Sequence, residues 1–502
     1  MAETIHRGKI RKPIAPEIVQ YISAPIAEAD FQTSYDTMLD VNRAHVLMLV
    51  KQGIIDRASA KTILQATERL AAERIAPDFV ANPKIEDLYT SLEQRLIADV
   101  GLEVGGRQHT ARSRNDLGAT VIRLDTRAYY LKIAALFIAF RKTLLKAARD
   151  GVDAVMSGYT HMQPSEPITF GHWASGVLSG LARDYSRFSH AWEGLNVNPL
   201  GACSMGSTSF PIDRAYTSRL LGFDAPLQNS IDSVATRDYA ADIVSSLAIS
   251  ADTLSRMAFD LYIWSTPEYG YVEVDDSCAV CSSIMPQKKN PFTLEHIKAK
   301  AGHMHGYLMA ILSTMKNIIY SHSKDTSVEA TKHLMLALKE MECDFVLADV
   351  TVRGIKLHRD RMLENARENF CTVTELANYL VRYDGIAFRE AHNIVAGVVG
   401  MLCDEKKTCG AIDRAAVNAV STKLFGFETK LTDELIRQAL DPARIAEAKN
   451  ITGGTARDEV SRQLDAIEQG IRADEALLAE RMEKVNAGAA LLKETETALL
   501  SS

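Results

Sequence analysis

The sequence predicts an all-α protein organised around several very long helices. Proline and glycine, which interrupt helices, account for only 14 and 28 of the 502 residues. Apolar residues recur at helical spacing over long stretches, whereas strand patterns are sparse. The longest helical patterns span Leu117–Ala148, Arg237–Trp264 and Leu294–Ile319. A helix of ~30 residues is ~45 Å long, which is more than a unit of short helices can cover.

Changes in these patterns along the chain predict three domains. Residues 1–115 mix short helices with turns, as in the helical patterns Asp40–Gly53 and Ser59–Leu70, and form a mainly helical N-terminal domain. Residues 116–365 form a central bundle of long helices. Residues 366–502 form a small helical C-terminal domain that ends in a charged helix near Asp458–Asn486.

The long helices also predict an oligomer. Many of them carry apolar or small residues on more than one face, which implies burial inside a bundle or against other subunits. We therefore expect a helical core that is shared between copies of the chain.

Composition excludes several classes of protein. Hydrophobic residues at 47% and charged residues at 24% are ordinary for a soluble globular protein. The net charge of −7 provides no general attraction to nucleic acid or to a membrane surface. The start of the chain lacks the apolar core of a secretory signal, and no apolar run reaches the length of a membrane span. A cytoplasmic location is expected.

Cysteine usage argues against a metal site. The seven cysteines are widely scattered, and the pair Cys278 and Cys281 has no second pair with suitable histidines. We expect reduced thiols and no bound metal.

The first of three polar stretches, residues 105–116, immediately precedes a long helix. It contains three arginines, a histidine and the side chains of Thr110, Ser113 and Asn115. Hydroxyl, amide and guanidinium donors at a helix N-terminus suit a carboxylate ligand. Taken alone, the stretch is equally consistent with helix capping and a basic surface.

The second stretch, residues 157–167, contains one glycine and two prolines. These residues are expected to hold Thr160, His161 and Gln163 in irregular backbone. A single loop histidine is more often exposed or structural than catalytic.

The third stretch, residues 281–291, lies between two long helical patterns. It combines two adjacent serines, two lysines and an asparagine, and Pro286 and Pro291 discourage helix. A loop rich in donors and cations on a helical scaffold is a candidate for chemistry, although a solvated basic turn would have a similar composition.

In order and spacing, the three stretches resemble the signature regions of the aspartase/fumarase superfamily, and the "QKKNP" loop is most similar to its argininosuccinate lyase branch. The first stretch matches "HTGRSRND" with Ala111 in place of glycine. The second matches "GYTHLQ" with Met162 in place of leucine. Further similar segments lie at residues 198–202, 229–239, 379–392 and 440–456, so the resemblance covers most of the chain beyond residue 100.

This resemblance implies a specific architecture. Members have a three-domain, all-helical fold, and the central helices of four subunits form a 20-helix tetramer core. Each active site collects the three signature regions from three different subunits. Members eliminate an amine or water from a succinyl group and release fumarate, and the elimination requires no cofactor.

The resemblance also implies roles for individual residues. Ser282 would be the base, with Ser283 as the alternative, because a shift of one position exchanges them. His161 would be the acid, oriented by Glu295, while Lys288 would stabilise the carboxylate that becomes an aci-carboxylate. The implied substrate-binding residues are Ser113, Arg114, Asn115, Thr160, Ser283, Met285, Asn290 and His322.

One stretch departs from the family pattern. Argininosuccinate lyases carry a sequence similar to "YNKDLQEDK", whose Tyr, Gln and Lys hold the arginine end of the substrate. Aligned on Lys324 and Asp325, this chain has His322, Ser327 and Ala330 at those positions. A site without those groups would discriminate poorly in favour of argininosuccinate.

We therefore expect a carbon–nitrogen lyase that acts reversibly on another N-substituted L-aspartate. A polycarboxylate such as ethylenediamine-N,N′-disuccinate (EDDS) is the leading candidate, because EDDS lyase also resembles this branch. Argininosuccinate lyase activity is the main alternative, and a non-catalytic structural homologue is the other.

Overall fold

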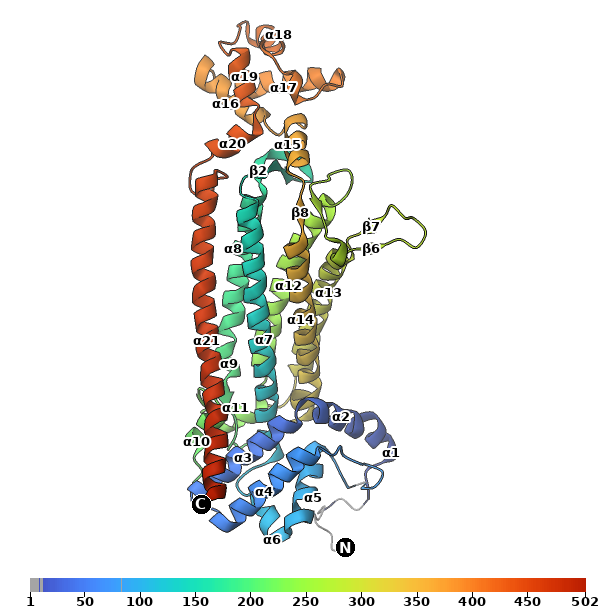
Figure 1. Cartoon of the computed structure of the whole chain (residues 1–502), viewed down its shortest axis with the longest axis vertical. Coiled ribbons are helices and arrows are strands. Elements are labelled where there is room, and N and C mark those ends of the chain that lie inside the picture. The colour runs from blue at the N-terminus through green and yellow to red at the C-terminus, as the bar shows by residue number, and fades with distance from the viewer. Residues whose placement is uncertain (1–8, 10–11, 83) are drawn as a thin grey trace.

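The structure, a computed structural model, describes residue 9, residues 12–82 and residues 84–502. The predicted all-α class is confirmed, since the strands in the described chain are few and short. Figure 1 shows an elongated bundle of long helices with a helical N-terminal unit at one end and a helical C-terminal unit at the other.

The N-terminal unit consists of short helices joined by capped turns. The side chains of Asp56 and Asp87 accept backbone hydrogen bonds at the starts of two of these helices, which satisfies donors that would otherwise be unpaired. The helices are α1 (Pro16–Ile18), α2 (Ala24–Thr33), α3 (Tyr35–Lys51), α4 (Arg57–Glu73), α5 (Leu88–Val100) and α6 (Leu102–Gly105).

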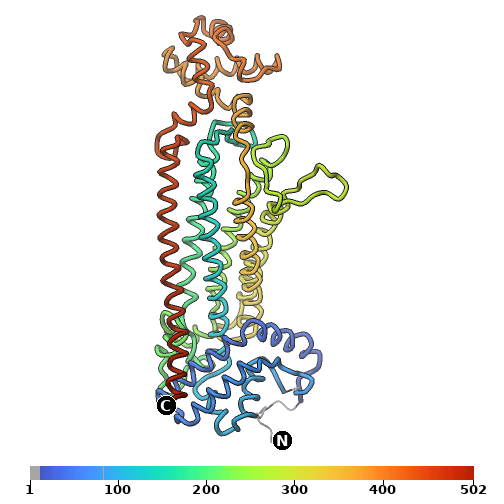
Figure 2. The backbone as a smooth tube through the Cα atoms, viewed as in Figure 1, coloured from blue at the N-terminus to red at the C-terminus, as the bar shows by residue number. Residues whose placement is uncertain are grey.

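Five long helices form the body of the bundle and run roughly parallel to its long axis (Figure 2). Their core is rich in aromatic side chains, among which Phe137 stacks on Phe345 with ring centroids 4.5 Å apart. The five helices are α7 (Arg114–Asp150), α8 (Phe170–His190), α12 (Asp238–Trp264), α13 (Phe292–Met315) and α14 (Ala330–Gly354). Short helices α9 (Trp192–Leu195), α10 (Arg214–Leu220) and α11 (Ser230–Ala235) connect α8 to α12.

The described chain also contains four small two-stranded sheets. Strands β1 (Val155–Thr160) and β2 (Gln163–Thr169) pair antiparallel, as do β6 (Val280–Cys281) and β7 (Lys289–Asn290). Strands β5 (Val272–Glu273) and β8 (Lys356–Leu357) are antiparallel, whereas β3 (Val197–Asn198) and β4 (Ala225–Pro226) are parallel. Except for β3–β4, these sheets lie toward the end of the bundle that carries the C-terminal unit, which we call the hairpin end (Figure 1).

The C-terminal unit is built from short helices with a separate apolar core. They are α15 (Arg359–Glu368), α16 (Val373–Asp384), α17 (Phe388–Asp404), α18 (Arg414–Phe425), α19 (Asp433–Ala439) and α20 (Pro442–Ala448). The last helix, α21 (Arg457–Ser501), leaves this unit and returns along the bundle (Figure 1).

The path of α21 corrects the predicted C-terminal domain of 366–502. Val460, Leu464 and Ile471 of α21 belong to the core of the bundle, and Arg141 of α7 donates to Asp474 at 2.6 Å. A helix of this length needs a long apolar partner, which the small C-terminal unit cannot supply. The unit therefore ends near residue 448.

None of the helices that the structure describes has the length and apolarity to cross a lipid bilayer.

A buried carboxyl group in the bundle leads to a test of pH-dependent stability. Asp344 on α14 is fully buried, and neither of its oxygens has a hydrogen-bond partner in the described chain. Burial raises the pKa of Asp344 to about 8; Lys300 opposes this rise and Glu340 adds to it. Folding therefore binds a proton that the unfolded chain releases above its ordinary pKa of about 4.

We predict that the free energy of unfolding falls as pH rises from about 4 to 8, by at most about 1.4 kcal/mol per pH unit from this group. Asp344→Asn removes this titration, so its stability relative to the wild type should rise between pH 5 and pH 8. Chemical unfolding at both pH values measures the effect. Asp360→Asn, on the exposed side of α15, is the control and should retain the wild-type pH dependence.

Candidate active site

The residues singled out in the sequence lie at opposite ends of α7. Ser113 caps the N-terminus of α7, and His161 lies in the β1–β2 hairpin that follows its C-terminus. Because α7 contains 37 residues, it spans about 55 Å. One group, Ser113, Arg114, Asn115 and His322, thus lies at the N-terminal end of the bundle. The other group, Thr160, His161, Ser282, Ser283, Met285, Lys288, Asn290 and Glu295, lies at the hairpin end (Figure 1).

The start of α7 is a fully formed capping box. The Ser113 hydroxyl accepts from the Asn115 amide at 3.3 Å, and the Asp116 carboxylate accepts from the Ser113 amide at 3.0 Å. Asp116 also accepts from the amides of Gly201 and Cys203, each at 2.9 Å, and thereby fixes the neighbouring loop. The Asn115 side chain donates to the Ser204 carbonyl at 3.0 Å.

The three arginines of this stretch do not converge on a common point. Arg107 pairs with Asp56 at 2.8 Å, and Arg114 pairs with Glu86 at 2.9 Å and Asp87 at 3.0 Å. Arg112 is buried, and its guanidinium donates to the Tyr89 hydroxyl at 3.3 Å. Arg107 and Arg114 are thus already neutralised by carboxylates within the chain, and binding of an anion by Arg114 would compete with that pairing.

The segment around His322 lies at the same end. Burial, with contributions from Arg237 and Lys324, lowers the pKa of His322 to about 4, so its imidazole is neutral near pH 7. The Nδ1 atom of His322 is buried without a hydrogen-bond partner in the described chain. A neutral imidazole adds no positive charge for a polyanionic substrate.

Sequence reasoning did not identify Tyr320, which lies two residues before His322. Its hydroxyl donates to Asp232 at 3.0 Å and lies 3.2 Å from the Thr236 hydroxyl, although the ring is 70% exposed. The next residue, Ser321, reaches the sulfur of Met205 at 3.6 Å. The sequence signal that could have identified Tyr320 is its position two residues before His322, next to the segment that departs from the family pattern.

At the hairpin end, Thr160 and Gln163 lie in the paired strands of a β-hairpin, and His161 lies in its turn, not in the irregular backbone that was expected. Thr160 pairs with Gln163, which leaves His161 and Met162 as a two-residue turn. Their φ angles of +53° and +58° are unusual for residues other than glycine and store about 1–2 kcal/mol each. In this turn the side chain of His161 is exposed to solvent.

The serine–lysine loop, residues 282–288, connects β6 to β7 and projects sideways from the bundle (Figure 1). Within it, the Ser282 hydroxyl accepts from the Met285 amide at 3.0 Å and from the Ile284 amide at 3.3 Å. Ser283, Met285 and Lys288 are exposed, and Lys288 has no side-chain partner in the described chain. The loop therefore carries a hydroxyl that accepts from two backbone amides and, within the described chain, an ammonium group without a side-chain partner.

Glu295 lies in the first turn of α13, at the foot of this loop. It accepts a hydrogen bond from the Tyr262 hydroxyl at 3.3 Å. Within the described chain no hydrogen bond or ion pair joins Glu295 to His161. Orientation of His161 by Glu295 would thus need a second copy of the chain.

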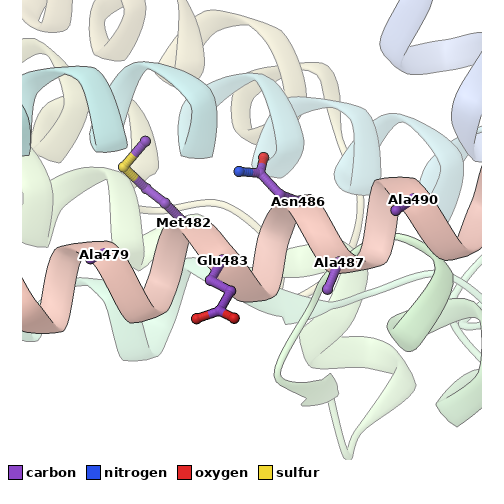
Figure 3. A pocket seen from close by; sticks show the side chains of 6 residues that line it. All are labelled: Ala479, Met482, Glu483, Asn486, Ala487 and Ala490. Atoms are coloured by element: carbon purple, nitrogen blue, oxygen red, sulfur yellow. The ribbon is translucent and has the colours of Figure 1, made fainter.

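A shallow hollow on the outer face of α21 contains none of these residues. Figure 3 shows it lined by Ala479, Met482, Glu483, Asn486, Ala487 and Ala490, all of which lie on α21. In the part of the chain that the structure describes, no group of three or more His, Cys, Asp and Glu side chains is arranged to hold a metal ion.

Comparison with known protein families gives two matches. The family model described as Lyase matches residues 26–306, and the model described as Argininosuccinate lyase C-terminal matches residues 370–447. Together they cover the N-terminal unit, most of the bundle and the C-terminal unit.

A curated relative and two solved structures are similar over nearly the whole chain. Argininosuccinate lyase 1 of Shouchella clausii is 42% identical over 93% of this chain and 94% of its own length. EDDS lyase in complex with formate is 29% identical, with a TM-score of 0.87 over 98% of this chain and 97% of that chain. A variant of EDDS lyase with bound fumarate has a TM-score of 0.86 at the same identity and coverage.

The strained turn leads to a prediction about stability. Met162→Val should lower the free energy of unfolding by about 1–2 kcal/mol, because a β-branched residue tolerates a positive φ poorly. Met162→Asn is the matched control and should be neutral or slightly stabilising, since asparagine adopts this conformation readily. Thermal unfolding of both variants provides the comparison, and equal stabilities would argue against strain at this turn.

Proposed function

This chain belongs to the argininosuccinate lyase branch of the aspartase/fumarase superfamily, and on that premise we propose that it eliminates an amine from an N-substituted L-aspartate and releases fumarate. The observation that carries the proposal is the serine–lysine loop. There, two backbone amides donate to the Ser282 hydroxyl, while the Lys288 ammonium group pairs with no side chain among the residues that the structure describes.

The loop is suited to the first step of the elimination. An unaided serine is far too weak an acid to act as a base near pH 7, but amide donors and a nearby cation stabilise its ionised form. Ser282 would remove a proton from the carbon beside a carboxylate, and the electron pair would move into that carboxylate as an aci-carboxylate. Lys288 and Asn290 would stabilise the resulting charge. The two amide contacts favour Ser282 over the exposed Ser283.

The second step breaks the carbon–nitrogen bond. The electron pair of the aci-carboxylate returns to form the double bond of fumarate, and the leaving nitrogen takes a proton from His161, directly or through water. Glu295 would sustain the positive charge of His161 before the transfer. Ser113, Asn115 and Thr160 would donate to the succinyl carboxylates. Acid–base chemistry suffices, so the proposed reaction requires neither metal nor organic cofactor.

We further propose that the site forms in a homotetramer from three subunits. The length of α7 supports an intermolecular site, because this helix of about 55 Å lies between Ser113 and the hairpin that carries His161 in one chain. The absence of a contact between His161 and Glu295 within the described chain is consistent with this arrangement. A cytoplasmic location remains a prediction from the sequence.

For the substrate, we propose an aminopolycarboxylate such as EDDS. Support comes from the divergent segment, where His322 stands at the position of the family's tyrosine, and from the overlap with EDDS lyase over 98% of the chain. Argininosuccinate is the second candidate. The observation in its favour is the 42% identity to an argininosuccinate lyase, which exceeds the 29% identity to EDDS lyase.

Fumarate release, followed by ultraviolet absorbance, tests the reaction and its substrate. We expect faster release from EDDS than from argininosuccinate, and loss of activity by about 10²–10⁴-fold in Ser282→Ala. Ser283→Ala is the control and should retain most of the activity. Release from argininosuccinate alone would contradict the proposed substrate, and a fully active Ser282→Ala would contradict the proposed base.

Mixed oligomers test the shared site. Asn115→Ala and Ser282→Ala change opposite ends of one chain, so co-expression should create some sites in which both residues are native. We expect activity well above the sum of the two separate variants. Co-expression of Ser282→Ala with Lys288→Ala is the control, because both changes lie in the same loop and no native site can form. Equal recovery in the two pairs would contradict the three-subunit site.

A further inference from the structure

Lys289, the first residue of β7 directly after the serine–lysine loop, is engaged differently from Lys288 within the loop. The Lys289 ammonium lies 2.8 Å from Glu273 Oε1 and 2.6 Å from Asp276 Oδ1. Lys288, its neighbour, makes no such contact in the described chain. Lys289 begins β7, whereas Lys288 belongs to the loop that precedes this strand, so the two ammonium groups have different surroundings.

The orientation of the loop depends on ion pairs such as those of Lys289, because the β6–β7 pairing that closes the loop is very short. Strands β6 and β7 contribute two residues each, and residues 282–288 beyond them are exposed or half-buried. Isolated two-stranded ribbons are marginally stable in water. The direction in which the loop projects is therefore set by whatever anchors its base.

Glu273 connects that anchor to the rest of the protein. It lies on β5, which pairs with β8 at the end of α14. Its carboxylate also lies 3.8 Å from Lys356 and 3.6 Å from His358. The hydrogen bond from Lys289 is the largest influence that lowers the pKa of Glu273, and the bonds to Asp276 and Glu273 raise the pKa of Lys289. Both partners thus stay ionised across the neutral range.

We propose that Lys289 is a positioning residue, which fixes the serine–lysine loop through Glu273 and Asp276 so that Ser282 and Lys288 face the substrate. The inference rests on the proposed function. It assigns different tasks to the two adjacent lysines: Lys288 meets the carboxylate of the substrate, and Lys289 holds the loop that carries it.

Loss of the anchor has a characteristic consequence. In Lys289→Met the catalytic side chains remain, but the loop samples orientations in which Ser282 is misplaced, so kcat falls more than KM rises. Lys289→Arg can still reach both carboxylates and should largely restore kcat. The pairs are partly exposed, with Lys289 at 34% and Glu273 at 39%, so each contributes only modestly.

The test combines hydrogen–deuterium exchange with fumarate kinetics on the full-length protein. In Lys289→Met we expect the amides of residues 282–288 to exchange about fivefold faster and kcat to fall by a similar factor, consistent with loss of two exposed ion pairs. Glu273→Gln should show a smaller change in the same direction. The double variant should match Lys289→Met alone, since both changes break the same contact.

Lys356→Met is the matched control. It removes another cation near Glu273 without touching the loop, and should leave exchange in residues 282–288 and kcat unchanged. Unchanged exchange in Lys289→Met, or additive effects in the double variant, would overturn the proposal. A rise in KM alone would do the same, because it would assign Lys289 to substrate binding. Exchange reports on the anchor without any substrate, so absence of fumarate release would count against the proposed function and not against the anchor.

Discussion

The length and rigidity of α7 are the constraint on which the rest of the molecule depends. A helix of 37 residues, capped at Ser113 and packed through Phe137 into an aromatic core, is a spacer of about 55 Å that cannot fold back. It separates donors for a succinyl carboxylate from the His161 turn. In the proposed site, each chain would therefore contribute parts to more than one active site, and catalysis would depend on the proposed homotetramer.

The bundle provides the core, and the proposed catalytic groups His161 and Ser282 lie in a turn and a loop outside it. His161 lies in a two-residue turn with positive φ, and Ser282 lies in a loop closed by two residues on each strand. Neither segment would hold its shape alone. The core beneath them is large enough to tolerate the strain of the turn, and a few side-chain contacts, chiefly those of Lys289, orient the loop.

The succinyl part and the amine part of the proposed site resemble the family motifs to different extents. The groups proposed to act on the succinyl part match the family motifs, and the structure equips Ser282 with the amide donors that such chemistry needs. Around the proposed amine part, His322 replaces the family's tyrosine and Tyr320 contacts Asp232. The part of the proposed site that would contact the leaving amine is therefore the part that differs most from the family motifs.

The sequence by itself determined the all-α class, the long central helices and the three polar stretches, because helical spacing and motif residues are local signals. The course of α21, the hairpin around His161 and the partners of Arg114 and Lys289 were decided only by the tertiary structure. Each depends on contacts between residues far apart in the chain, such as Arg141 with Asp474 and Lys289 with Glu273. Local patterns show which side chains can form an ion pair, but only packing brings the two partners within 3 Å.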